Sequence, residues 1–175
     1  MTERAEITRL TVAEIRTNVV ALSRLVRDGF ATGAALGFLA PLTDARLAAF
    51  WASVADEVAA ERRVVLGAGP PYAAIGTVQL ILDQADNGGH RCELAKLAVR
   101  ADARGAGVGR SLVEAAEQVA AEIGRPTIEL TTHADTPPVD FYLHLGYVTV
   151  GRLPHWAVAP SGEFVDNVLM VKQVS

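Results

Sequence analysis

The first third of the chain carries two stretches in which apolar residues recur every three or four positions. In residues 11–29 the predicted face comprises Val12, Ile15, Val19, Leu22 and Val26. Thr11 and Glu14 have the spacing of a capping box, and Gly29 is expected to end this helix. In residues 43–61 the face comprises Leu47, Phe50, Trp51, Val54 and Val58. The pattern predicts two successive helices, each with one side in the core.

Short apolar runs separated by turn residues follow these helices. The predicted strands are residues 62–69, 73–82 and 91–99. Pro70 and Pro71 separate the first two, and the turn-rich residues 83–90 should close a hairpin between the second and third. We therefore expect antiparallel pairing for these three strands.

In the second half of the chain, stretches with helical periodicity alternate with short apolar runs typical of strands. A helix is predicted with Val108, Leu112, Val113, Ala116, Val119 and Ile123 facing inward, ended by Gly124 and Pro126. The remaining predicted elements are a strand at 127–132, a short helix at 137–147, a strand at 148–153, a loop at 154–164 and a strand at 166–172. With a strand before the first helix, the order β-α-α-β-β-β-α-β-α-β-β indicates an α/β (α+β) fold. It predicts a mixed, mostly antiparallel sheet with helices on both faces.

Composition narrows the classes of protein to consider. The 175 residues are 50% hydrophobic, which suits one domain spanning residues 1–175. The formal net charge of −4 gives no basic surface for nucleic acid or an anionic membrane. Cys92 is the only cysteine, and no apolar run is long enough to cross a bilayer. We expect a cytoplasmic protein with no membrane segment.

Three glycines stand where a predicted strand turns into a predicted helix. In "RGAGVG" these are Gly105, Gly107 and Gly109, flanked by Arg104 and Arg110 as possible counter-charges. Bare backbone at a helix N-terminus can direct successive N–H groups at an anion, preferably a phosphate. The spacing fits neither a P-loop, which needs a following lysine, nor a dinucleotide fingerprint, since Arg110 replaces its third glycine. A flexible turn is the competing interpretation.

The stretch "VRADARGAGVGRSLV" resembles the acyl-CoA signature R/Q-x-x-G-x-G/A of the GNAT acetyltransferases, through Arg104, Gly107 and Gly109. The order of predicted elements is similar too, and segments across most of the chain resemble the tabtoxin-resistance type of that family. The resemblance implies a GNAT fold with acetyl-CoA as co-substrate. Its pyrophosphate would lie on the main chain of Gly105, Ala106, Gly107, Val108, Gly109 and Arg110. The pantetheine arm would follow Leu97, Ala98 and Val99, where the fourth and fifth strands splay.

The same resemblance implies two catalytic residues. Glu93 matches the glutamate that acts as general base, and Tyr142 matches the tyrosine that protonates the departing thiolate. Each has a structural alternative. Glu93 could be an exposed strand residue paired with Lys96 or Arg91, and Tyr142 could simply fill the core.

Other positions depart from the family pattern or lie at the acceptor opening. Thr131 stands where the tabtoxin-resistance type has an aspartate that assists the glutamate, and its neighbours Thr132 and His133 could hold a water. Thr136 or Asp135 would replace an asparagine that contacts CoA. Phe38 and Trp156 are expected beside the acceptor opening, or in packing roles. The four histidines, His90, His133, His144 and His155, have no metal-ligand spacing, so we expect no metal.

Together these features favour a cytoplasmic N-acetyltransferase that transfers an acetyl group from acetyl-CoA to a small-molecule amine by direct attack. The alternatives are a non-catalytic acyl-CoA-binding sensor or scaffold, and an enzyme for protein lysines or amino termini. We expect neither nucleic acid nor membrane as a partner. The sequence leaves the acceptor and the oligomeric state open.

Overall fold

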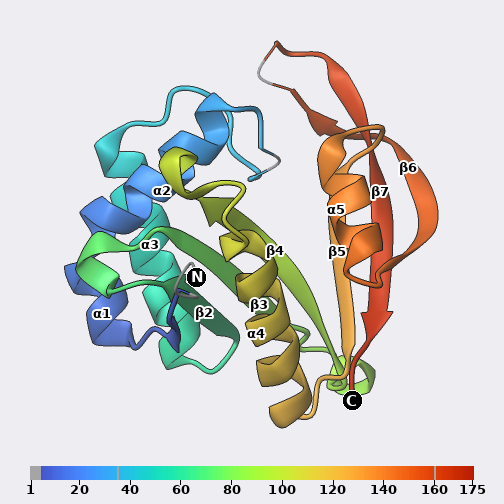
Figure 1. Ribbon diagram of the computed structural model, residues 1–175, viewed down its shortest axis with the longest axis horizontal. Coiled ribbons are helices and arrows are strands. Elements are labelled where there is room, and N and C mark those ends of the chain that lie inside the picture. The colour runs from blue at the N-terminus through green and yellow to red at the C-terminus, as the bar shows by residue number, and fades with distance from the viewer. Residues whose placement is uncertain (1–4, 35, 160) are drawn as a thin grey trace.

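The computed structural model describes residues 5–34, 36–159 and 161–175. Across these residues the chain forms one seven-stranded sheet in the order β1-β2-β3-β4-β5-β7-β6, with helices on both faces (Figure 1). The strands are β1 (Ile7–Arg9), β2 (Arg63–Ala68), β3 (Gly76–Leu82), β4 (Arg91–Val99), β5 (Thr127–His133), β6 (Val148–Val158) and β7 (Phe164–Gln173). The helices are α1 (Val12–Thr17), α2 (Val19–Ala31), α3 (Asp44–Ala59), α4 (Val108–Glu122) and α5 (Pro137–His144). Short 3₁₀ turns cover Pro71–Ala73, Asp86–Gly88 and Ala101–Ala103.

The predicted mixed, mostly antiparallel sheet is confirmed. All neighbouring strands pair antiparallel except β4 and β5, which are parallel. One core lies between the sheet and α1, α2 and α3, and includes Trp51 and Leu22. The other lies under α4 and α5 and includes Leu112 and Tyr147. No helix of the described residues has the length and apolar character needed to cross a bilayer.

The single helix predicted over residues 11–29 is divided in two. The capping box of Thr11 and Glu14 is present, but the helical backbone breaks at Asn18, where φ is −111° and ψ is 22°. The Glu14 carbonyl accepts hydrogen bonds from both the main-chain N–H of Asn18, at 3.0 Å, and its side-chain amide, at 2.8 Å, so the side chain adds a second bond where the backbone departs from the helix. Gly29 does not end the second helix, which continues to Ala31. Gly29 is instead buried against Leu36, whose Cδ1 lies 2.7 Å from the place of an added Cβ.

The helix ending at Gly124 has one residue placed differently from the prediction. Ile123 was expected to face inward, but it is the C-cap of α4 and 36% exposed. Ala120 is the buried residue of the last turn. The face rotates here because the apolar stripe follows positions 108, 112, 113, 116 and 120.

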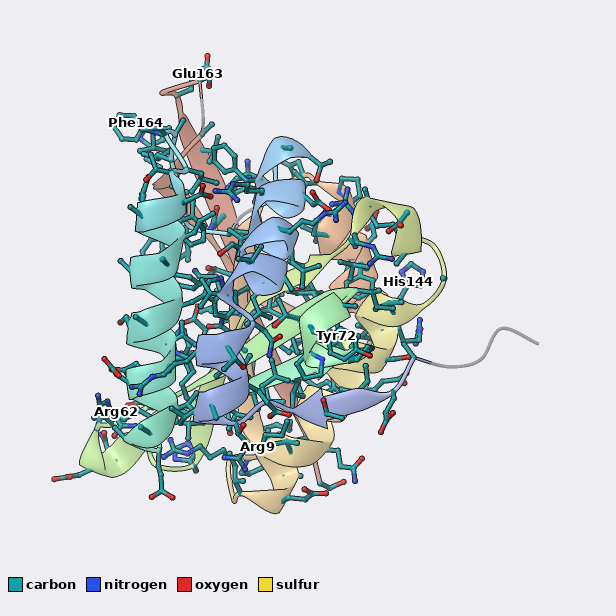
Figure 2. All side chains as sticks on the ribbon, turned by 90° about the vertical axis from the view of Figure 1, so that its left-hand side faces the viewer. Arg9, Arg62, Tyr72, His144, Glu163 and Phe164 are labelled. Atoms are coloured by element: carbon teal, nitrogen blue, oxygen red, sulfur yellow. The ribbon has the colours of Figure 1, made fainter. Side chains whose placement is uncertain are left out.

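The loop predicted over residues 154–164 is largely a β-hairpin. β6 continues to Val158 and β7 begins at Phe164, and Glu163 and Phe164 lie at the tip, beyond the helices (Figure 2). Pro154 is tolerated because β6 is the edge strand, where one N–H needs no partner. The strand is irregular between Leu153 and Ala157, where the His155 N–H donates to Asp166 at 2.9 Å. The hairpin therefore extends the sheet where a loop was expected.

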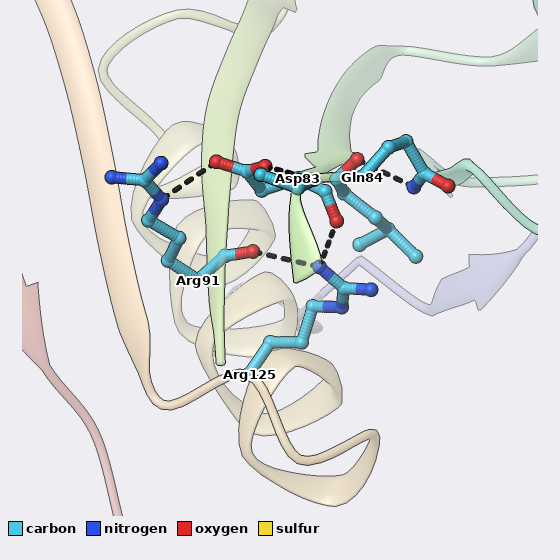
Figure 3. Close-up of polar contacts among 6 residues, drawn as sticks. Asp83, Gln84, Arg91 and Arg125 are labelled. Carbon is cyan, nitrogen blue, oxygen red and sulfur yellow. Dashed lines mark hydrogen bonds and ion pairs between the residues drawn. The ribbon is translucent and has the colours of Figure 1, made fainter. Parts of the chain in front are cut away.

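β4 and β5 are in register over only three residue pairs, ending at Glu93 and Glu129. Figure 1 shows the two strands side by side near the C-terminus and diverging toward the other end of the sheet. Arg125 ties together the paired end, since its guanidinium donates to the carbonyls of Asp83 at 2.7 Å and Arg91 at 3.0 Å (Figure 3). Arg91 in turn donates to the Asp83 carboxylate at 2.6 Å. The strands are thus held at one end and open at the other.

β4 also contains a bulge within its open half. The register against β3 shifts between Thr77 and Gln79, and Lys96 has a φ of +56°. A bulge places one extra residue in the strand and changes which face the following side chains occupy. Leu97 accordingly packs with the core under α4, whereas Ala98 packs with the core under α2 and α3.

Candidate active site

The glycine-rich turn leads into the N-terminus of α4. Gly107 is the N-cap, in the left-handed conformation with φ +82°, and Gly105 has φ +76°. The first helical bond runs from the Ser111 N–H to the Gly107 carbonyl, which leaves the N–H groups of Val108, Gly109 and Arg110 without partners in the helix. An added Cβ at Gly105 or Gly107 would meet no atom within 4 Å. The turn therefore presents open main chain at the positive end of a helix dipole.

A cavity of about 480 Å³, which we call the turn groove, lies along this main chain. The expected cofactor residues that line it are Leu97, Ala98, Val99, Arg104, Gly105, Gly107, Val108, Gly109 and Arg110. Ala106 and Thr136 are not among its lining residues. The Thr136 hydroxyl donates to the His133 carbonyl at 2.6 Å and so has a local partner.

The two flanking arginines differ in their contacts. Arg104 donates to the Val99 carbonyl at 3.0 Å and to the Asp28 carbonyl at 3.2 Å, which ties the end of β4 to α2. It is therefore a structural link as well as a nearby positive charge. Arg110 lies 3.6 Å from Glu114 in an exposed pair, where solvent screening weakens the attraction. Arg110 is the more adaptable of the two cations.

The open edge of β4 faces the gap between the strands. The Arg100 N–H donates to the carbonyl of Ile75, just before β3. Successive residues of a strand direct their main-chain N–H and C=O groups to opposite edges. Val99 and Leu97 consequently direct theirs away from β3, as the Arg104 contact to the Val99 carbonyl shows. These groups can pair with an extended ligand lying in the gap.

A second cavity of about 550 Å³, the central chamber, adjoins the turn groove. The two cavities share Ala34, Leu97 and Phe141 as lining residues. All six residues predicted for catalysis or acceptor binding line the chamber: Phe38, Glu93, Thr131, His133, Tyr142 and Trp156. Residues from five separate segments of the chain are brought together there.

Glu93 is half-buried on β4, at the last residue pair before the strands diverge. Burial raises the pKa of its carboxyl group, and the negative charge of Glu129 adds to this effect, while Lys96 and Arg63 oppose it. Within the described residues the carboxylate makes no hydrogen bond or ion pair, so neither Lys96 nor Arg91 pairs with it. A carboxylate with a raised pKa and free lone pairs is suited to accepting a proton. Cys92 faces the opposite side, in the core under α4.

Thr131 lies in the chamber, but the acidic residue near Glu93 is Glu129. The two glutamates are register partners across the parallel pair, whereas Thr131 is two positions further along β5. Sequence reasoning missed Glu129 because it compared only the position of the family aspartate. The alternation of exposed and buried residues along β5 could have indicated that Glu129 and Thr131 share a face.

Tyr142 approaches the chamber from α5. Its side chain is 8% exposed, and its ring meets Phe141 and Tyr147 edge-on, at 5.1 Å and 5.5 Å between centroids. Burial raises the pKa of the phenol, so it stays protonated at neutral pH. The hydroxyl has no hydrogen-bond partner in the part of the chain that the structure describes. Tyr142 therefore packs in the core through its ring and leaves a proton donor at the cavity wall.

Phe38 and Trp156 line the chamber from different parts of the chain. Phe38 belongs to the segment between α2 and α3, and its ring packs edge-on against Phe50 at 5.1 Å. Arg46 and Lys96 approach the Phe38 ring at 5.9 Å and 5.8 Å from its centroid. Trp156 comes from β6 and is 60% exposed. Phe38 is a fixed wall, whereas Trp156 has room to change its contacts.

The sequence analysis gave no binding role to two polar residues that line the chamber, Lys96 and Asn167. Lys96 was considered only as a partner for Glu93, and Asn167 was not considered, since nothing in its local sequence distinguishes it. The His, Cys, Asp and Glu side chains of the described residues form no group of three or more suited to a metal ion.

A glycine turn at a helix N-terminus, opening onto a splayed strand pair, is the arrangement that the sequence resemblance led us to expect of an acetyltransferase. Residues 28–147 match the model of the Acetyltransferase (GNAT) family, and the chain belongs to this family.

Solved structures share the fold across nearly the whole chain. An N-acetyltransferase from Staphylococcus aureus Mu50 has a TM-score of 0.80 at 14% identity, covering 99% of this chain and 100% of that one. A phosphinothricin acetyltransferase from Sinorhizobium meliloti, in complex with AcCoA, has a TM-score of 0.76 at 16% identity, covering 99% and 90%. A ribosomal-protein-alanine N-acetyltransferase from Brucella melitensis has a TM-score of 0.73 at 20% identity, covering 97% and 99%. At sequence identities of 14–20%, the structural similarity to these proteins establishes the fold of the chain.

Proposed function

We propose that the protein transfers the acetyl group of acetyl-CoA to the amine of a small molecule by direct attack, as one domain over residues 1–175. The observation that carries this proposal is the junction of the two cavities. Glu93 and Tyr142 line a chamber that shares Leu97 and Phe141 with the turn groove. A cofactor held by its phosphates in the groove can therefore place its thioester in the chamber. That acetyl-CoA is present in the Sinorhizobium meliloti neighbour adds support.

In the proposed binding mode, the pyrophosphate accepts hydrogen bonds from the main chain between Gly105 and Arg110. The pantetheine arm follows the open edge of β4 beside Leu97 and Val99. Arg110 supplies an adaptable positive charge.

In the proposed reaction, the amine nitrogen attacks the carbonyl carbon of the thioester and a C–N bond forms. Glu93 accepts the proton that the amine loses, directly or through one water. The C–S bond breaks, and the departing thiolate takes the proton of the Tyr142 hydroxyl. The products are an amide and free CoA, and the proton gained by Glu93 returns to solvent or to Tyr142.

The walls of the chamber favour a small acceptor. The aromatic side chains of Phe38 and Trp156 line it, and its volume of about 550 Å³ must also admit the acetyl end of the cofactor. A resemblance to the tabtoxin-resistance type points the same way, although Thr131 replaces the aspartate of that type. Glu129 is proposed to take over part of its effect, by raising the pKa of Glu93.

The test is release of free thiol from acetyl-CoA against a panel of small amines, lysine peptides and peptides with free amino termini. The proposal expects turnover with small amines, and product mass increased by one acetyl group. Saturable acetyl-CoA binding without thiol release for any amine would favour the sensor. Turnover with peptides alone would favour a protein acceptor.

A further inference from the structure

Lys96 occupies an unusual position on the chamber wall. It is the bulge residue of β4, and its φ of +56° lies in the left-handed region, which lysine rarely adopts. Strained positions of this kind cluster at functional sites because the surrounding structure must hold them. Its side chain lines the chamber, as does that of Glu93. Its Nζ lies 3.1 Å from the position that a Cβ on Gly37 would occupy, next to Phe38 in the chain.

The Lys96 ammonium lacks an anionic partner. Among the described residues it lies 5.8 Å from the centroid of the Phe38 ring, and it forms no ion pair or hydrogen bond. Burial lowers the pKa of Lys96, and the negative charge of Glu93 only partly opposes this. A half-buried ammonium loses part of its hydration, and a paired anion recovers that free energy.

A second polar group in the chamber is also unpaired. Asn167, on β7, is 5% exposed, and its Oδ1 is buried with no hydrogen-bond partner. Asn167 lines the chamber from the wall formed by β5 and β7, whereas Lys96 lies on the β4 wall. A ligand that carries an anionic group for Lys96 and an N–H or O–H donor for the Asn167 Oδ1 can satisfy both groups.

The charges of the chamber specify what kind of ligand fits. Lys96 is the sole lysine or arginine among the described lining residues, and Glu93 is the sole carboxylate. One cation matches one monovalent anionic group, whereas a phosphate dianion normally requires several cations or a helix N-terminus. The rest of the wall near Lys96 is apolar, including Phe38 and Leu36.

We propose that Lys96 binds a carboxylate on the acceptor, so that the acceptor is a small amino carboxylate, and that the Asn167 Oδ1 accepts a hydrogen bond from an N–H of the same acceptor. This inference rests on the proposed function. The acceptor amine lies toward Glu93 and the thioester, and its carboxylate lies toward Lys96 and Phe38. The carboxylate does not react. Lys96 is thus a specificity-determining residue that rejects amines lacking an anionic group.

The test compares amino acids with their own carboxamides, since each pair differs in one charge and little in shape. Binding of both forms to the CoA-saturated protein is measured by calorimetry, and thiol release is measured with acetyl-CoA. The variants are Lys96→Met, which keeps an unbranched stem, and Lys96→Arg, which keeps the charge. Arg46→Met is the matched control, because Arg46 approaches the same Phe38 ring but does not line the chamber. Thermal unfolding verifies that each variant is folded.

We expect the parent to bind at least one carboxylate of the panel tenfold or more tightly than its carboxamide. Lys96→Met should bring that ratio close to one, Lys96→Arg should keep part of it, and Arg46→Met should leave it intact. Asn167→Leu should weaken both members of a pair. Equal binding of the two forms by the parent, no binding of any carboxylate, or a full preference retained in Lys96→Met would each overturn the inference.

The proposed function fails by a different outcome. If acetyl-CoA binds but no amine of any charge releases thiol, acetyl transfer is refuted. If uncharged amines are acetylated as well as amino carboxylates, transfer stands and the role of Lys96 is refuted.

Discussion

Tyr142→Phe separates the catalytic role of Tyr142 from its packing role, because it removes one oxygen and keeps the ring. The contacts of the residue with Phe141 and Tyr147 are made through the ring, and its hydroxyl has no partner among the described residues. A net hydrogen bond is worth about 0.5–1.5 kcal/mol, and none is lost here. The free energy of unfolding should therefore change by less than about 1 kcal/mol.

The effect on the reaction should be much larger. Loss of a positioned general acid typically lowers the rate by about 10²–10⁴-fold, which corresponds to about 2.7–5.5 kcal/mol in the activation free energy. Because burial raises the pKa of Tyr142, the parent keeps its proton throughout the neutral range. We expect kcat to fall about 10²-fold or more, with the Kd of acetyl-CoA little changed.

The assay is single-turnover thiol release, which measures chemistry without product release. A thioester whose thiol has a lower pKa needs less protonation, so it should partly rescue Tyr142→Phe. Equal single-turnover rates for variant and parent with acetyl-CoA would refute the role of the hydroxyl.

Three further changes test the glutamates and the glycine turn. Glu93→Gln should lower kcat at neutral pH and remove the acidic limb of the pH–rate profile. Because burial raises the pKa of Glu93, the ionised carboxylate destabilises the folded parent at pH 7, so the variant should be at least as stable by thermal unfolding. Glu129→Gln removes a negative charge that raises the pKa of Glu93, so the acidic limb should move to lower pH, and an unmoved limb would contradict that coupling. Gly107→Ala should raise the Kd of acetyl-CoA at least tenfold, about 1.4 kcal/mol, by titration calorimetry. Gly124→Ala, at φ +75° outside the groove, carries the same left-handed strain and should leave the Kd unchanged.

The elements with strong local signals could be predicted from the sequence. The apolar periodicity and the capping box located the helical segment that contains α1 and α2 and the later helix α3, and the glycine turn identified the start of α4. Asn18 could not be predicted as a break, because its main-chain N–H still donates to the Glu14 carbonyl as in a helix, and only its φ and ψ depart from helical values. Pro154 indicated a loop, and only the edge position of β6 makes a strand compatible with it.

Some residues of the candidate site could be predicted from the sequence, and others could not. The glycines stand out through a linear motif and Glu93 and Tyr142 through the resemblance to the family, and all of them line the two cavities. Lys96 and Asn167 depend on tertiary structure. The bulge in β4 decides where Lys96 points, and the pairing of β7 with β5 brings Asn167 to the chamber from 71 residues further along the chain (167 − 96). Neither arrangement leaves a pattern in the neighbouring sequence.

The central claim is that the turn groove holds the phosphates of CoA and delivers its sulfur to the chamber. A crystal structure of the protein at saturating CoA tests this most directly. The account predicts pyrophosphate oxygens accepting hydrogen bonds from the main chain between Gly105 and Arg110, with the sulfur within hydrogen-bonding distance of the Tyr142 hydroxyl. CoA bound elsewhere, or bound in the groove with its sulfur directed away from Tyr142 and Glu93, would contradict it.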